Sequence, residues 1–320
     1  MRRAIVLVPL GLALLAPAPA LAHGGGQGPP PTDALGIALA WHLDIPIILG
    51  LLVAAALYVS AIRSVDAAHP ANRWSRRRTV AFLVGLVAIG VALLSPIDTL
   101  SDDLLSVHML QHLLMTSVAA PLFAASGLGT IALRVASPDV RGRYLLPFLH
   151  SRLMSALTFP VVGLVVYVLT MWATHFTTLY NLALLDDGVH ALEHLLYLVA
   201  ASLFWWPLLS PDPLRWRIHP GAGLILLAAS MPAGAFLGVT IMSAPDVLYP
   251  AYLGRPDAFG IDALADQAIA GAEYWAVGGM ATLAAGAYLL VLLMRHEEAE
   301  TKRVDALLDR NRRTLSRKES

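Results

Sequence analysis

Long apolar runs alternate with short polar stretches over most of the 320-residue chain. Seven of the runs approach or exceed the roughly 20 residues that an α-helix needs to cross a bilayer. They cover about 40–62, 79–95, 107–133, 153–174, 188–209, 220–243 and 266–294. The pattern therefore predicts an all-α integral membrane protein with seven transmembrane helices in one bundle.

The two ends of the chain differ from this apolar region. Residues 1–22 are typical of a secretory signal peptide, because two arginines precede an apolar stretch and a small-residue cleavage sequence ends at Ala22. An uncleaved first helix is the alternative. Residues 23–39 predict a flexible Gly/Pro-rich periplasmic leader, and cleavage would make His23 a terminal residue with an amine and an imidazole to offer a metal.

The seven-helix membrane domain is predicted to occupy 40–294, and 295–320 predict a polar cytoplasmic tail, as a short amphipathic helix or as disorder. Nineteen of the 22 Lys and Arg residues lie in this tail or in the connections that follow the first, third and fifth helices. Of the remaining three, only Arg255 lies in the other connections. Because cytoplasmic loops are enriched in Lys and Arg, we expect the C-terminus inside and the mature N-terminus outside.

The composition agrees with a membrane protein and restricts the metal chemistry. Hydrophobic residues make up 57% of the chain and charged residues 14%, against about 25% charged residues in soluble domains. Cysteine is absent, which excludes disulfides, zinc–thiolate sites and iron–sulfur clusters. Any metal must therefore be held by His, Met, Asp, Glu or the backbone. The predicted surroundings are the lipid bilayer, and we expect no nucleic-acid partner.

Two histidine pairs open predicted helices on the outer side of the bundle. His108 and His112 begin the third helix, and His190 and His194 begin the fifth. The i,i+4 spacing places both imidazoles of a pair on one helix face. Facing helices of a bundle commonly supply the ligands of a metal site, so we predict these four residues as ligands. Separate interfacial histidines are the alternative, and the equal depth of the two pairs weakens it.

Other polar residues lie at the same outer level, where polar side chains within spans usually mark a site. Five are predicted as additional ligands or as groups that orient the ligands: Asp98, His175, Glu193, Asp266 and Glu273. A carboxylate such as Glu193 can hydrogen-bond a ligating histidine and fix its orientation. The alternative for Glu193 is a carboxylate that only faces the positive end of its helix dipole.

Copper is the favoured ion and zinc the alternative. Imidazole suits Zn, Cu, Fe and Ni, and a cysteine-free site with methionines in reach on the outer side favours copper over structural zinc. A haem clamped between the two turns is a further possibility. The sequence His190-x-x-Glu193-His194 also matches the inverted zincin pattern, so a zinc-dependent membrane hydrolase remains open. A copper transporter would need a polar path through the cytoplasmic half, which has almost no ionisable residues.

Several short motifs follow one another along the membrane region. They are Ser95-Pro96-Ile97-Asp98, His108-Met109-Leu110-Gln111-His112-Leu113-Leu114-Met115, Ala120-Pro121-Leu122, Leu179-Tyr180-Asn181-Leu182-Ala183, His190-Ala191-Leu192-Glu193-His194, Phe204-Trp205-Trp206-Pro207, Leu248-Tyr249-Pro250-Ala251-Tyr252 and Asp266-Gln267-x-x-Ala270-Gly271. Together they resemble the CtaG-type cytochrome c oxidase assembly factors over about 40–294. In that resemblance the family's histidine motifs fall on the four predicted ligands.

The resemblance implies a multi-span protein of the bacterial plasma membrane that is not an enzyme. It would hold or pass copper during assembly of a haem–copper oxidase, with an oxidase subunit or another copper-delivery protein as partner. One motif departs from the family. Where relatives carry an apolar residue, Met and Trp, this chain has Glu273-Tyr274-Trp275. If that Met is a ligand in relatives, Glu273 would replace it here and make the site less selective for Cu(I).

Overall fold

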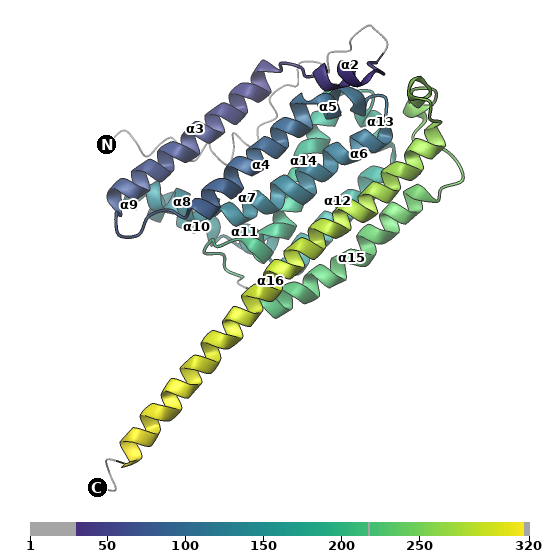
Figure 1. Ribbon diagram of the computed structural model, residues 1–320. Helices are drawn as coiled ribbons and strands as arrows, with labels where there is room; N and C mark the ends of the chain where they lie inside the picture. The colour runs from purple at the N-terminus through teal and green to yellow at the C-terminus, as the bar shows by residue number, and fades with distance from the viewer. Residues whose placement is uncertain (1–29, 217, 317–320) are drawn as a thin grey trace.

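The computed structural model describes residues 30–216 and 218–316, and all the regular structure in these ranges is helical (Figure 1). The predicted signal peptide, its uncleaved alternative and His23 lie outside the described residues. The leader contains one short helix in its described part, α2 (Ala34–Leu39), which begins where Asp33 caps the backbone N–H of Gly36. The all-helical class predicted from the apolar pattern is confirmed.

Six helical segments among the described residues are long and apolar enough to cross a membrane, so the chain is a multi-pass membrane protein. They are α3 (Ile45–Ala68), α4 (Arg76–Leu94), the run Leu105–Val135, α14 (Asp187–Leu209), α15 (Pro220–Met242) and the apolar part of α16 (Ala263–Ser316). Figure 1 shows the long helices running alongside one another, with α16 continuing far beyond the others. The polar tail therefore prolongs the last helix to Ser316.

The predicted span at 153–174 is divided into two helices. Two residues, Thr158 and Phe159, separate α11 (Arg152–Leu157) from α12 (Pro160–His175), which has 16 residues. Phe159 has extended backbone angles, φ −67° and ψ 124°, because a residue that precedes proline is disfavoured in the helical region. α12 is apolar but shorter than the six segments above, and a count of seven spans remains a prediction.

The third predicted span is also interrupted. α6 (Leu105–Leu113) passes into a π-helical turn, η1 (Leu114–Ala119), followed by α7 (Ala120–Ser126) and α8 (Leu128–Val135). Pro121 has no N–H to bond the carbonyl four residues earlier, which favours such a local widening. Gly127, at φ 76°, then separates α7 from α8 in the left-handed conformation that glycine adopts without strain. The turn begins two residues after His112 and shifts the register of the helix below the predicted site.

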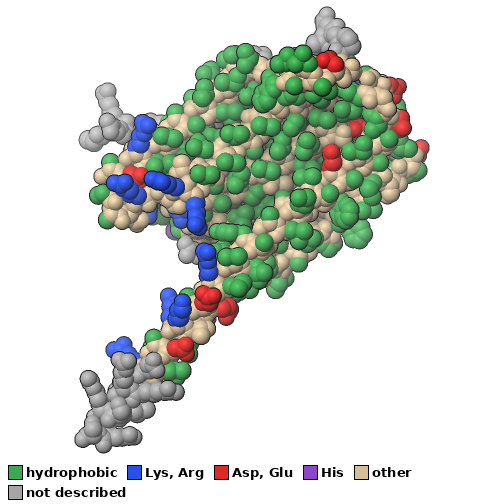
Figure 2. Space-filling model, viewed as in Figure 1, with side chains coloured by type: hydrophobic (Ala, Val, Ile, Leu, Met, Phe, Trp, Pro, Cys, Tyr) green, Lys and Arg blue, Asp and Glu red, His purple; other side chains and the backbone are tan. Residues whose placement is uncertain are grey.

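Figure 2 shows how charge is distributed over one face of the molecule. A broad band of hydrophobic side chains covers the bundle. Lys and Arg side chains gather at the end from which α16 projects, and Asp and Glu side chains gather toward the opposite end and on the projecting tail. This separation matches the asymmetry of basic residues along the sequence.

Close backbone contact joins α15 to α16. A Cβ added to Gly271 would lie 2.5 Å from the carbonyl oxygen of Gly238, and one added to Gly238 would lie 2.7 Å from that of Gly271. Small residues allow membrane helices to approach closely enough for such packing. Gly234, which forms a GxxxG pair with Gly238 in the sequence, meets only a ring carbon of Tyr274 at 3.8 Å. The contact therefore depends on Gly238 and Gly271.

Replacing Gly271 by Ala should destabilise the folded protein by about 1–3 kcal/mol, because the added methyl group meets backbone atoms that cannot move aside locally. Gly279→Ala is the matched control, since nothing lies within 4 Å of a Cβ at that position on the same helix. Thermal unfolding in detergent micelles measures the effect. Equal melting temperatures for the two variants would contradict the assigned contact.

Candidate metal centre

The four predicted ligands meet in the structure. Each offers a ring nitrogen, and these nitrogens all lie within 4.8 Å of one another. We call His108, His112, His190 and His194 the histidine cluster. Its side chains are almost fully buried, with residue exposures of 1%, 3%, 3% and 8% respectively. The sequence pattern placed each pair on one helix face, and the fold turns the two faces toward each other.

The two helices pack with their histidine turns in register. Ring centroids are 4.4 Å apart between His108 and His112 on α6, and 4.2 Å apart between His190 and His194 on α14. Across the helices, His108 lies 4.9 Å from His190, and His112 lies 5.2 Å from His194. The four rings therefore form a compact group with two members from each helix.

The spacing of the donors suits a metal ion. Nε2 of His108 and Nε2 of His112 are 3.0 Å apart. Two ligands of a tetrahedral ion with metal–nitrogen bonds of about 2.0 Å are separated by about 3.3 Å. Since the widest donor separation is 4.8 Å, small rotations of the imidazoles would bring all four nitrogens to bonding distance. The donor set fits a borderline ion such as copper or zinc.

Asp266 holds the beginning of α6 in place. Its carboxylate, on α16, accepts hydrogen bonds from the backbone N–H of Leu105 at 2.6 Å and from the Ser106 hydroxyl at 2.5 Å. A carboxylate at a helix N-terminus satisfies unpaired N–H groups and faces the positive end of the dipole. Both carboxylate oxygens are engaged in this way, so Asp266 acts on the cluster by positioning the helix that carries His108 and His112.

Asp98 fixes the rotation of the same helix. The side-chain amide of Gln111, which lies between the two histidines of α6 in the sequence, donates to Asp98 Oδ1 at 2.6 Å and to the carbonyl of Ala92 at 2.9 Å. The other carboxylate oxygen lies 3.3 Å from Nε2 of His42. Asp98 therefore supports α6 from a position outside the histidine cluster.

Glu193 is the carboxylate nearest the cluster. Its Oε1 accepts a hydrogen bond from the Tyr197 hydroxyl at 3.0 Å. Its Oε2 is buried without a hydrogen-bond partner among the described residues and lies 3.9 Å from Nε2 of His112. This position allows Glu193 to orient His112 or to balance the charge of a bound ion.

His175 lies beside the same group of rings, where α12 ends. Its Nδ1 is 2.7 Å from the carbonyl oxygen of Met171, which can only accept, so Nδ1 carries the proton. Its Nε2 is buried and has no hydrogen-bond partner in the part of the chain that the structure describes. The ring centroid lies 5.3 Å from that of Tyr180 and 6.0 Å from that of Tyr197. His175 is thus separated from the four clustered donors by aromatic rings.

Glu273 is not among the clustered donors. Its side chain lies on α16 and is half-buried, with Oε2 lacking a hydrogen-bond partner. The neighbouring Tyr274 approaches His175, with 6.1 Å between ring centroids. The structure therefore gives no geometric support to Glu273 as a substitute for the family's methionine.

Three buried tyrosines contact rings of the cluster, and reasoning from sequence gave them no role: Tyr180, Tyr197 and Tyr252. A fourth buried tyrosine, Tyr249, packs against Tyr180, with 4.4 Å between ring centroids. Tyr180 comes from α13 (Thr178–Ala183), and Tyr249 and Tyr252 come from the connection between α15 and α16. Burial raises the pKa of Tyr180, Tyr249 and Tyr252, so these three phenols stay neutral at physiological pH. Three of these four residues, Tyr180, Tyr249 and Tyr252, occur in the family motifs, but no spacing in the sequence reveals that they meet.

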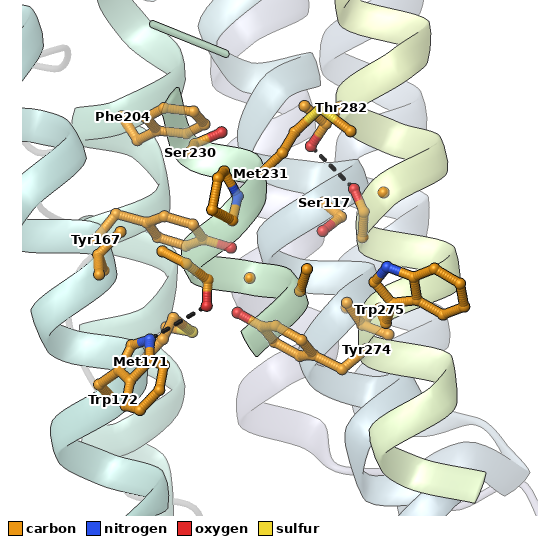
Figure 3. A pocket seen from close by; sticks show the side chains of 18 of the residues that line it. Ser117, Tyr167, Met171, Trp172, Phe204, Ser230, Met231, Tyr274, Trp275 and Thr282 are labelled. Carbon is orange, nitrogen blue, oxygen red and sulfur yellow. Dashed lines mark hydrogen bonds between the residues drawn. The ribbon is translucent and has the colours of Figure 1, made fainter. Parts of the chain in front are cut away.

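A cavity of about 270 Å³ has Leu113, Met171 and Tyr274 in its lining (Figure 3). Its lining is mainly apolar, and no histidine contributes to it. Figure 3 shows the rings of Tyr167 and Tyr274 approaching each other, and a hydrogen bond from Trp172 that ends on the carbonyl of Ala233 at 3.3 Å. The cavity is therefore separate from the metal-binding geometry.

Comparison with known proteins decides the family. Residues 56–296, most of the chain, match the family described as cytochrome c oxidase caa3 assembly factor, Caa3_CtaG. The chain belongs to this family. The family assignment made from the ordered motifs is thus confirmed, and the four clustered histidines are members of those motifs.

The similar curated proteins are longer than this Caa3_CtaG chain. An uncharacterized protein of Mycobacterium leprae is 27% identical over 296 residues, which are 90% of this chain and 44% of the relative. An uncharacterized protein of Mycobacterium bovis is 24% identical over 294 residues, with the same two coverages. The chain thus spans less than half the length of these relatives. No solved structure matches the chain.

Replacing Asp266 by Ala should lower the stability of this Caa3_CtaG protein by about 1–2 kcal/mol, because the buried N–H of Leu105 loses its acceptor. Thermal unfolding in micelles measures the loss. Asp257→Ala is the control, since this aspartate is exposed in the connection before α16. If Asp266→Ala and Asp257→Ala unfold at the same temperature, Asp266 does not anchor α6.

Proposed function

We propose that this protein binds copper at the periplasmic face of the bacterial plasma membrane and holds or passes it during assembly of a haem–copper cytochrome c oxidase. One observation carries the proposal: four buried imidazoles from two helices lie within 4.8 Å of one another in a member of an oxidase assembly family. The acceptor would be an oxidase subunit or another copper-delivery protein.

The proposed orientation rests on the distribution of charge. Arg and Lys gather at the end from which α16 projects, and Asp and Glu gather toward the end that carries the N-terminus of α6 (Figure 2). With the positive end in the cytoplasm, the histidine cluster lies in the outer half of the membrane. Seven crossings, with α11 and α12 together forming the fourth, would place the mature N-terminus outside and the C-terminus inside.

Copper transfer of this kind makes and breaks only metal–ligand bonds. Each imidazole binds through an unprotonated ring nitrogen, so protonation competes with the ion and affinity should fall at acidic pH. Burial of the cluster excludes water and competing ligands. Release to an acceptor then proceeds by replacing the imidazoles one at a time with the acceptor's own donors.

The donor set of the site contains no thiolate, and it favours copper over zinc. All four clustered donors are imidazoles, and the affinity of nitrogen sites for divalent ions is greatest for copper. A zinc hydrolase that uses His190, Glu193 and His194 is the alternative of a different class. Membership in an assembly family and the tyrosine cover over the cluster both favour binding over hydrolysis.

Copper stoichiometry tests the shared site. Wild-type protein should retain copper, and both His108→Ala/His112→Ala and His190→Ala/His194→Ala should lose it, because each removes half of the ligands. His219→Ala/His296→Ala is the matched control, since these two rings also contact each other, at 4.9 Å, on different helices outside the cluster. Retention of copper by both test variants would show that the cluster is not the site. Retention of zinc with rejection of copper by the wild type would contradict the proposed cargo.

Replacing Glu193 by Gln separates the two classes of function. In a hydrolase this change should abolish peptide cleavage while the metal stays bound, because the carboxylate would be the general base. In a copper-binding protein it should leave copper stoichiometry intact and alter affinity only modestly, because the four imidazoles remain. Metal analysis of purified variants and a peptidase assay on wild type provide both measurements; peptidase activity that depends on Glu193 would favour the hydrolase.

A further inference from the structure

Tyr252 connects the outer connection between α15 and α16 to the histidine cluster. It ends the short helix η3 (Pro250–Tyr252) and is 2% exposed. Its hydroxyl oxygen makes two short contacts, each of 2.8 Å. One reaches the carbonyl oxygen of Ser101, at the end of α5 (Pro96–Ser101), and the other reaches Nδ1 of His108.

These two contacts determine where the His108 ring carries its proton. The carbonyl of Ser101 can only accept, so the single phenol proton of Tyr252 is donated to it. The phenol oxygen is then an acceptor for its second partner, and Nδ1 of His108 must supply the proton of that hydrogen bond. With the proton on Nδ1, the Nε2 atom of a neutral imidazole carries a lone pair and no proton. The opposite tautomer would leave two acceptors competing for one phenol proton.

This unprotonated nitrogen faces the other histidines of the cluster. Nε2 of His108 is the atom that lies 3.0 Å from Nε2 of His112. In the metal-free protein this contact is satisfied when His112 Nε2–H donates to it. His108 and His112 would hold a metal ion through unprotonated Nε2 atoms, and the proton of a neutral His112 would then lie on its Nδ1, which has no hydrogen-bond partner among the described residues.

We propose that Tyr252 is a positioning residue of the metal centre, which holds His108 in the tautomer whose Nε2 lone pair points at the other three histidines. The tautomer assignment is independent of the proposed copper function, and the effect on copper affinity rests on that function. Groups that hydrogen-bond the second nitrogen of a ligating histidine commonly change metal affinity by about 10–100-fold when they are removed.

Tyr252→Phe removes the hydroxyl and keeps the ring. Tyr249→Phe is the matched control, because Tyr249 lies in the same connection, is equally buried, and donates its hydroxyl to the backbone carbonyl of His175 at 3.3 Å rather than to a clustered histidine. Nitrogen-15 NMR of metal-free protein with labelled histidine reports which ring nitrogen is protonated. Competition with a copper chelator reports affinity.

In the wild type we expect His108, assigned through a His108→Ala variant, to carry its proton on Nδ1. Tyr252→Phe should populate both tautomers and bind copper about 10–100-fold more weakly, and Tyr249→Phe should match the wild type in both measurements. A wild-type His108 protonated on Nε2 would overturn the proposal, as would a Tyr252→Phe variant with an unchanged tautomer and unchanged affinity. If the wild type binds no copper, the proposed function fails, while the tautomer measurement still decides the role of Tyr252.

Discussion

Burying four imidazoles within a membrane bundle is the constraint on which the rest of the structure depends. A polar group removed from water is costly unless it finds a hydrogen-bond partner, and lipid offers none. The surrounding residues meet this requirement at several points. Tyr252 accepts from His108, Gln111 is held by Asp98, and the N-terminus of α6 is capped by Asp266. The contacts of Tyr252 and Asp266 join residues 144 and 161 positions apart, so the site and the fold specify each other.

The sequence predicts the parts of this arrangement that depend on local spacing. The i,i+4 repeat on a helix face fixes the relation of His108 to His112 and of His190 to His194, whatever the rest of the chain does. The apolar runs likewise predict the long helices. Whether α6 packs against α14 at the level of these turns depends on long-range contacts. In the sequence, the equal depth of the two histidine pairs was the evidence for that contact.

Other features escaped the sequence because they depend on long-range contacts. Asp266 looked like a possible ligand, and only its contact with Leu105, 161 residues away, shows that it caps a helix. Tyr252 and His108 are 144 residues apart, and no periodicity connects them. The division of the fourth span has a local cause in Pro160, yet an apolar run of sufficient length concealed it. Sequence spacing therefore predicts which histidines meet better than it predicts the groups that support them.

The tyrosine cover also bears on how a buried ion would leave. With the four clustered histidines at most 8% exposed, an acceptor could not exchange ligands with an ion held there until some covering segment moved. Tyr180 and Tyr252 lie on short helical turns between long helices, and such turns open at lower free energy than the packed spans. Moving Tyr252 would also remove the acceptor that holds His108 Nδ1–H. Movement of Tyr252 would then open a path to the ion and weaken its binding by His108 at the same time.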